Sequence, residues 1–509
     1  MFENQPKALY ALALANTGER FGYYTMIAVF SLFLRANFGL SGDTAGLIYG
    51  VFLALVYFLP LVGGIMADKF GYGKMVTIGI IVMFAGYLFL SIPLGGGVMG
   101  YAAMFGALLL VSLGTGLFKG NLQVMVGNLY DAPELSAKRD SGFSIFYMAI
   151  NIGALFAPTA AVRIKEWAEH SLGYSGNDAY HFSFAVACVS LILSMMIYYA
   201  FRSTFKHVEA GAGKSKKTDT AGTEEELTPQ QTKERIVALC LVFAVVIFFW
   251  MSFHQNGLTL TFFADEFVSP KSEGVQTMAF DVINLVMIIF MIYSLMSFFQ
   301  SKTSKAKLIS TVVFLAAVGV LVYKYHNIGG PVDVSAPIFQ QFNPFYVVAL
   351  TPVSMAIFGA LAAKGKEPTA PRKIAYGMII AGSAYLLMVL ASRGLLTPNE
   401  QAAAKAAGET VPFASGNWLI GTYLILTFGE LLLSPMGISF VSKVAPPKYK
   451  GTMMGGWFVA TAIGNLLVSV GGFLWNDIPL TIVWSVFIVL CLLSAGFMFL
   501  MMKRLEKVA

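Results

Sequence analysis

Residues 51–90 read VFLALVYFLPLVGGIMADKFGYGKMVTIGIIVMFAGYLFL, two long apolar runs separated by one short turn that holds every charge of the stretch, namely Asp68, Lys69 and Lys74. A helix needs about 20 apolar residues to cross the hydrocarbon core of a bilayer. A membrane β-barrel is excluded, because the apolar runs are continuous rather than alternating. The stretch therefore predicts two membrane helices joined by a tight charged turn.

The same apolar pattern continues along the whole chain. Of the 509 residues, 57% are hydrophobic and only 12% are charged, and the mean hydropathy is +0.71. Soluble domains carry roughly 25% charged residues, so most of this surface cannot face water. We count fourteen apolar stretches, which predict an all-α polytopic membrane protein: 8–34, 44–66, 74–93, 101–127, 141–162, 181–201, 236–262, 277–299, 308–325, 337–362, 373–392, 417–441, 451–473 and 479–502.

The Lys and Arg residues are distributed unevenly between the loops. If the N-terminus is cytoplasmic, 25 of the 34 fall on the cytoplasmic side and seven on the outer side, and Arg20 and Lys119 lie within helices. This bias follows the positive-inside rule. We therefore expect a multi-pass protein of the inner or plasma membrane with both termini in the cytoplasm. The net charge of +7 then reflects topology, and no nucleic-acid partner is implied.

The three cysteines offer no chemistry of their own. Cys188, Cys240 and Cys491 all lie in apolar stretches, without a CxxC pair or a cluster of histidines. This spacing argues against a disulfide framework and against a metal site, so we expect neither a metal nor an organic cofactor.

The longest polar segment, 202–235, divides the chain into six apolar stretches and eight. We interpret it as a cytoplasmic linker between an N-terminal bundle, 1–201, and a C-terminal bundle, 236–509. The charged turn quoted above resembles the signature between the second and third helices of the major facilitator superfamily. That resemblance implies two six-helix bundles around a central site, with 277–299 and 308–325 as two extra helices.

Acidic, basic or histidine side chains lie deep within four of the predicted membrane helices. Glu19 and Arg20 lie in the first, Lys119 in the fourth, His254 in the seventh and Glu430 in the twelfth. A charge at mid-bilayer costs about 3 kcal/mol on insertion scales, so such residues usually mark a functional pathway. Cations on two helices and a carboxylate on a third would suit a short zwitterion. The structural alternatives are ion pairs that hold helices together and, for His254, a simple hydrogen bond to a neighbour.

Five segments together resemble the family of proton-dependent oligopeptide transporters. The resemblance is specific because the segments occur in the family's order; each alone would be weak. They are NTGERFGYY at 16–24, GTGLFKGN at 114–121, FYMAINIG at 146–153, FQQFNP at 339–344, and GELLLSP at 429–435 followed by GWF at 456–458.

The resemblance implies import of di- and tripeptides by alternating access, with protons as the coupling ion and a single chain as the working unit. It implies that Arg20 and Lys119 hold the peptide carboxylate and that Asn151, Asn343 and Glu430 hold its amino terminus. The residues implied to line side-chain pockets are Tyr23, Tyr24, Tyr57, Trp250, Ser434 and Trp457.

The chain departs from the family pattern at several positions. Asn16 stands where the first glutamate of the helix-one motif is usual, and Ile27 where an arginine is usual. His254 replaces an acid of helix seven, and Gly120 replaces a proline. The two extra helices follow the helix-seven motif instead of preceding it.

These departures bear mainly on proton coupling. Because Asn16 cannot titrate, the candidate coupling groups are Glu19, Glu430 and His254, with Glu19 as the principal group and His254 as a modulator. One alternative is an uncoupled carrier of another small zwitterionic or anionic solute. A sensor that binds without transporting is another. A membrane-embedded enzyme would need a nucleophile with a base or a metal cluster, and the sequence offers neither.

Overall fold

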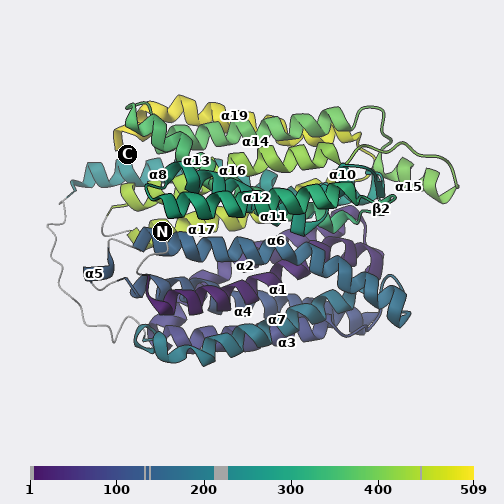
Figure 1. The fold of residues 1–509 in the computed structure, drawn as a ribbon, viewed down its shortest axis with the longest axis horizontal. Coiled ribbons are helices and arrows are strands. Elements are labelled where there is room, and N and C mark those ends of the chain that lie inside the picture. The colour runs from purple at the N-terminus through teal and green to yellow at the C-terminus, as the bar shows by residue number, and fades with distance from the viewer. Residues whose placement is uncertain (1–4, 131–132, 137–138, 211–226, 447–449, 509) are drawn as a thin grey trace. The chain divides into compact units, whose positions relative to one another are not determined.

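A computed structural model describes residues 5–130, 133–136, 139–210, 227–446 and 450–508 of the chain. Almost all of this part is helical (Figure 1). The elements are α1 (Lys7–Phe38), α2 (Gly42–Phe70), α3 (Tyr72–Leu90), α4 (Val98–Asn128), α5 (Pro133–Ser136), α6 (Arg139–Leu172), α7 (Tyr180–Ala200), η1 (Arg202–Thr204), η2 (Lys206–Val208), α8 (Pro229–Phe253), η3 (His254–Gly257), α9 (Thr259–Glu266), β1 (Lys271–Ser272), α10 (Gln276–Ala279), α11 (Val282–Gln300), α12 (Ser304–His326), β2 (Val332–Asp333), η4 (Ala336–Gln341), α13 (Phe342–Ala363), α14 (Ala370–Ala391), α15 (Pro398–Ala406), α16 (Asn417–Val444), α17 (Lys450–Leu467), α18 (Ser469–Phe473) and α19 (Leu480–Val508).

The helices confirm an all-α, multi-pass membrane protein. Thirteen helical spans in the described part of the chain are long and apolar enough to cross a bilayer. The 32-residue helix α1 is not among them, because Glu19, Arg20 and the polar residues around them lower its hydropathy. Thirteen of the fourteen apolar stretches expected from the sequence fall on one helix or on two consecutive helices, and the stretch 236–262 covers α8, η3 and α9.

The contacts within the chain define two compact units. Unit 1 comprises Met1–Leu258, Ile438–Phe473 and Leu500–Ala509, and unit 2 comprises Thr259–Gly437 and Leu474–Phe499. In unit 1, α17 and α18 pack on α2, and α17 also packs on α8. The units therefore differ from the bundles 1–201 and 236–509 expected from the sequence, and that division into two bundles stays a prediction.

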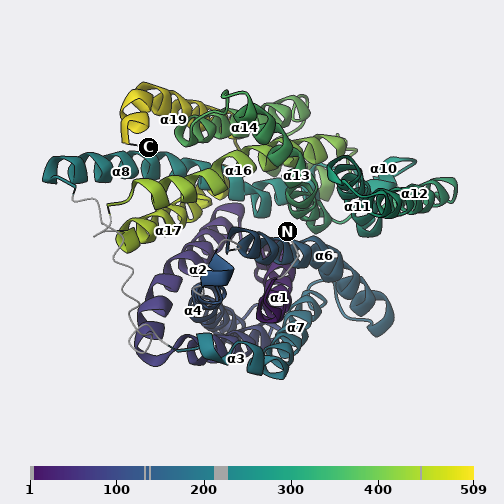
Figure 2. The same ribbon diagram turned by 60° about the vertical axis from the view of Figure 1, so that its left-hand side comes forward.

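The first six long helices of unit 1 form one bundle, in which α1 packs on α6 and α7, and α4 packs on α2 and α3 (Figure 2). Small residues allow the closest of these approaches. A Cβ atom added at Gly79 of α3 would lie 2.7 Å from the carbonyl oxygen of Gly114 on α4, a distance that real Cβ atoms do not tolerate. Glycine at these two positions thus lets the two backbones touch.

The charged turn between α2 and α3 is contacted by residues that follow α7 in the sequence. Gly71 adopts a φ of 97° at the α2–α3 turn, which favours glycine. The next glycine, Gly73, donates its backbone N–H to the carbonyl oxygen of Glu209 at 3.2 Å. The Glu209 carboxylate accepts from Arg202 at 2.8 Å and from Tyr198 at 3.0 Å, and this carboxylate raises the pKa of Arg202 above its ordinary value.

The expected linker 202–235 contains helical residues at both of its ends. Residues 202–208 form the short helices η1 and η2, and α8 begins at Pro229 with a capping box between Thr228 and Gln231. A capping box satisfies two backbone N–H groups at a helix start. Residues 211–226, the middle of that segment, lie outside the described residues.

The two extra helices lie at the edge of unit 2, where α11 and α12 form a hairpin (Figure 2). Only 22% and 11% of their apolar windows are buried, against 56% for α14. The hairpin is attached through α11, which packs on α13, and Tyr293 donates to the carbonyl oxygen of Val348 at 3.1 Å. A two-residue antiparallel ribbon, β1 with β2, lies on the loops that flank the hairpin.

The glycine contact between α3 and α4 gives a first prediction. Gly79→Leu should destabilise the protein by about 1–3 kcal/mol, because overpacking forces the two backbones apart. Gly106→Leu is the matched control, since a Cβ atom at this position of α4 meets nothing within 4 Å. Thermal unfolding in detergent measures the difference. Equal melting temperatures for the two variants would contradict the close packing of α3 on α4.

Candidate functional site

The Glu19 and Arg20 side chains of α1 bind each other. Arg20 donates from Nε to Glu19 Oε2 and from Nη2 to Oε1, both at 2.5 Å, and the two side chains are 0% and 3% exposed. The guanidinium also lies 4.6 Å from the centre of the Tyr23 ring. Asn16, one turn before Arg20, is buried, and its Nδ2 has no partner in the described part of the chain. The charges of Glu19 and Arg20 thus cancel locally.

Lys119 of α4 has no such counterion. Its Nζ lies 4.1 Å above the centre of the Tyr57 ring on α2, a cation–π contact. Across residues 5–130, 133–136, 139–210, 227–446 and 450–508, no carboxylate lies within ion-pair distance of this lysine. Lys119 is therefore an uncompensated cation within a membrane span of unit 1.

His254 lies where α8 changes into the 3-10 turn η3. Its ring stacks on Trp250, with centroids 5.1 Å apart, and lies 6.2 Å from the Tyr57 ring. His254 Nδ1 donates to Asn465 Oδ1 of α17 at 2.5 Å. Sequence reasoning did not select Asn465, although a lone polar residue within an apolar stretch was a signal for it.

In unit 2, Glu430 of α16 is held by neutral donors. Asn343 of α13 donates from Nδ2 to Glu430 Oε2 at 2.9 Å and to Thr427 Oγ1 at 3.0 Å. Glu430 is 8% exposed, and none of the ion pairs among the described residues includes it. Ser434, one turn further along α16, has a buried Oγ without a partner in the described part of the chain. Unit 2 therefore holds an uncompensated carboxylate.

The thirteen residues selected from the sequence are thus divided between the units, with Asn343, Glu430 and Ser434 in unit 2 and the other ten in unit 1. Asn151 is buried on α6 and donates to the carbonyl oxygen of Tyr147 on its own helix. Trp457 is buried on α17, where its ring lies 6.5 Å from that of Phe243. Tyr24 is half-buried and packs edge-on against Tyr23.

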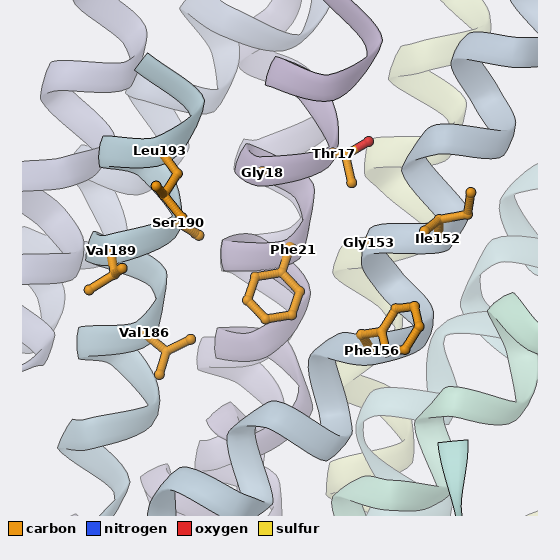
Figure 3. A pocket seen from close by; sticks show the side chains of 10 residues that line it. All are labelled: Thr17, Gly18, Phe21, Ile152, Gly153, Phe156, Val186, Val189, Ser190 and Leu193. Atoms are coloured by element: carbon orange, nitrogen blue, oxygen red, sulfur yellow. The ribbon is translucent and has the colours of Figure 1, made fainter. Parts of the chain in front are cut away.

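A cavity of about 390 Å³ lies elsewhere on unit 1. Figure 3 shows it between α1, α6 and α7, with Phe21, Phe156 and Val186 around it. No charged side chain lines it, so it offers nothing to a charged solute. It suits hydrocarbon, and the ionisable residues of the site lie outside its lining.

Within the described residues, no group of three or more His, Cys, Asp and Glu side chains could hold a metal ion. The candidate site offers hydrogen bonds, ion pairs and aromatic contacts. Such a site can bind and release a charged solute.

Residues 73–222 and 324–483 match the PTR2 model, described as the POT family, and together they make up more than half of the chain. The protein belongs to the POT family. It is 27% identical to the dipeptide and tripeptide permease B of Xenorhabdus bovienii, over 92% of this chain and 86% of that protein. It is 29% identical to a di-/tripeptide transporter of Lactococcus lactis subsp. cremoris, over 92% and 89%.

The fold is shared with solved structures of the same family. A crystal structure of a peptide transporter POT in complex with sulfate superposes on this POT protein with a TM-score of 0.74. The match covers 100% of this chain and 96% of the other, at 22% sequence identity. This likeness confirms the major facilitator fold expected from the turn at residues 68–74.

The ion pair on α1 gives the second prediction. Glu19→Leu leaves Arg20 buried without a counterion, which should cost about 3–5 kcal/mol of stability. Replacing both residues with leucine should recover most of this loss, because a buried pair exchanged for apolar side chains is close to neutral. Thermal unfolding of the single and double variants measures the coupling between the two residues.

The control for this cycle is the exposed pair Arg163–Glu166 of α6, whose atoms lie 3.1 Å apart. Arg163→Leu should change stability by no more than about 1 kcal/mol, since exposed pairs contribute little. A double variant of Glu19 and Arg20 as unstable as the single variant would contradict the pairing.

Proposed function

We propose that this POT protein imports di- and tripeptides across the inner or plasma membrane, with protons as the coupling ion. The proposal is supported by membership of the family and by relatives named as di- and tripeptide permeases. We further propose that both termini are cytoplasmic and that one chain is the working unit.

The observation that carries the proposal is the pair of uncompensated charges. Lys119 in unit 1 and Glu430 in unit 2 have opposite signs, and neither has a counterion among the described residues. An isolated charge within a membrane span is costly unless a partner neutralises it. A dipeptide zwitterion brings one carboxylate and one ammonium group, which complement these two residues. An enzyme would need a reactive pair of side chains, which this charge pattern does not supply.

The proposed contacts follow the charges. The peptide carboxylate binds Lys119 and, after it competes with Glu19, Arg20. The peptide ammonium group binds Glu430, with Asn343 and Asn151 as neutral partners. Ammonium groups have three donors and carboxylates only acceptors, so the two ends of a peptide are distinguished.

The proposed coupling uses the same competition. Glu19 Oε1 and Oε2 both accept from Arg20. A substrate carboxylate that takes Arg20 leaves Glu19 without its counterion, so that a proton becomes its best partner. Glu430 and His254 are the further proposed proton-binding groups. One charge moved through 100 mV supplies about 2.3 kcal/mol, which can drive accumulation.

Glu430→Gln tests the ammonium contact. Gln keeps the size of the side chain but removes its charge, and loss of one partner of a buried pair costs about 3–5 kcal/mol, or a hundredfold or more in affinity. Competition against labelled dialanine uptake in proteoliposomes measures this affinity. N-acetylated dialanine is the control, because it lacks the ammonium group and should bind the variant and the wild type equally. Wild-type affinity of Glu430→Gln for dialanine would remove the assignment.

Glu19→Gln tests the coupling. The wild type should accumulate labelled dialanine in proteoliposomes under a proton gradient directed with transport, and should not do so without one. The variant should lose this accumulation and keep counterflow exchange of dialanine, because exchange needs no net proton movement. Accumulation by Glu19→Gln would move the coupling role to Glu430 or His254. A wild type that transports but ignores the gradient would be an uncoupled carrier, in line with Asn16.

A further inference from the structure

Five residues from four regions of unit 1 form what we term the His254 cluster. Tyr57 lies between Lys119, whose Nζ is 4.1 Å from its ring centre, and His254, whose ring centre is 6.2 Å away. Trp250 stacks on His254 at 5.1 Å, and Asn465 binds the same imidazole. These residues connect α2, α4, the α8–η3 junction and α17.

The cluster contains a cation and no anion. Lys119 forms no ion pair within the described residues, and Glu19 is occupied through both oxygens by Arg20. The other polar groups of the cluster are the hydroxyl of Tyr57, the indole N–H of Trp250, the imidazole of His254 and the amide of Asn465, and none of them brings a carboxylate. The cluster therefore contains the positive charge of Lys119 and no negative charge.

The cluster also holds hydrogen-bond donors without acceptors. Trp250 Nε1 and Asn465 Nδ2 are buried and have no acceptor in the described part of the chain. Indole N–H and ammonium groups can only donate. Asn465 Oδ1 already accepts from His254 Nδ1, and the other ring nitrogen of a neutral imidazole is an acceptor without charge. What the cluster lacks is an acceptor with negative charge.

A carboxylate supplies both an acceptor and a negative charge, because it accepts hydrogen bonds through two oxygens and is ionised. We propose that the His254 cluster makes this transporter prefer peptides with an acidic side chain, whose carboxylate binds beside Lys119 and His254. The inference rests on the proposed function of peptide transport and adds the class of peptide. Every peptide brings its C-terminal carboxylate to Lys119 and Arg20. Once Arg20 is released from Glu19, these two cations leave one positive charge for the carboxylate of an acidic side chain.

His254 acts here as a positioning residue through Asn465. The Nδ1–H of His254 donates to the amide oxygen of Asn465. The amide nitrogen of Asn465 therefore remains a donor without an acceptor in the described part of the chain. A glutamate at this position would accept from that nitrogen and place a negative charge beside Lys119, so the cluster would be complete without substrate. A glutamine can still donate to Asn465 Oδ1 and adds no charge.

The test compares two peptides that differ only in side-chain charge. Ala-Glu and Ala-Gln compete against uptake of labelled dialanine in proteoliposomes, and the readout is the ratio of their inhibitory concentrations. In the wild type, Ala-Glu should compete about tenfold better than Ala-Gln, as expected for one additional charge-assisted contact. Equal competition would overturn the inference while dialanine uptake leaves the proposed function standing.

Two variants locate the effect. His254→Gln should keep the preference for Ala-Glu, and His254→Glu should abolish or reverse it. The ratio does not change with a general loss of activity, and stabilisation of the purified variants against heat by each peptide gives the same comparison without transport. Retention of the acidic preference by His254→Glu would overturn the role of His254. Failure of all three peptides to be transported or to stabilise the protein would overturn the proposed function and this inference together.

Discussion

The bidentate ion pair between Glu19 and Arg20 is the interaction on which the charge pattern of unit 1 depends. Each side chain alone would be a buried charge within a membrane span, which is strongly unfavourable. Together they have no net charge, and both sit on one turn of α1 with less than 4% of either side chain exposed. Both carboxylate oxygens of Glu19 accept from Arg20, so Glu19 does not form an ion pair with Lys119. Lys119 is therefore available to a solute.

Unit 2 presents its charge in a different way. Glu430 is held by an amide, Asn343, which satisfies one oxygen without cancelling the charge. A neutral donor orients a carboxylate and leaves its attraction for cations intact. Glu19 is therefore bound to a counterion, whereas Glu430 is positioned to receive one.

Substitutions relative to the family pattern act on this same charge balance. Asn16 and His254 both stand where acids are usual, and neither of them supplies Lys119 with a counterion. The aromatic face of Tyr57 takes that place, and a cation–π contact compensates a charge only in part. The inserted helices α11 and α12 form a largely exposed hairpin that is attached to α13.

Several features followed from local sequence alone. Apolar length and the loop charges predict the membrane helices, and the helical period places Arg20 and Tyr23 on one face of α1 beside Glu19. The family motifs then select Lys119 and Glu430. All of these depend on neighbours within a few residues, or on patterns shared with relatives.

The tertiary structure determined which side chains from distant parts of the sequence bind each other. His254 meets Asn465 across 211 positions of sequence, Asn343 meets Glu430 across 87, and residues 202–209 fold back on the α2–α3 turn. Such contacts depend on how helices pack, and each helix alone is compatible with many packings. Sequence by itself therefore determined that these charges lie in the membrane and that Glu19 has Arg20 as its neighbour. Only the packed structure decided that Lys119 and Glu430 have no counterion among the described residues.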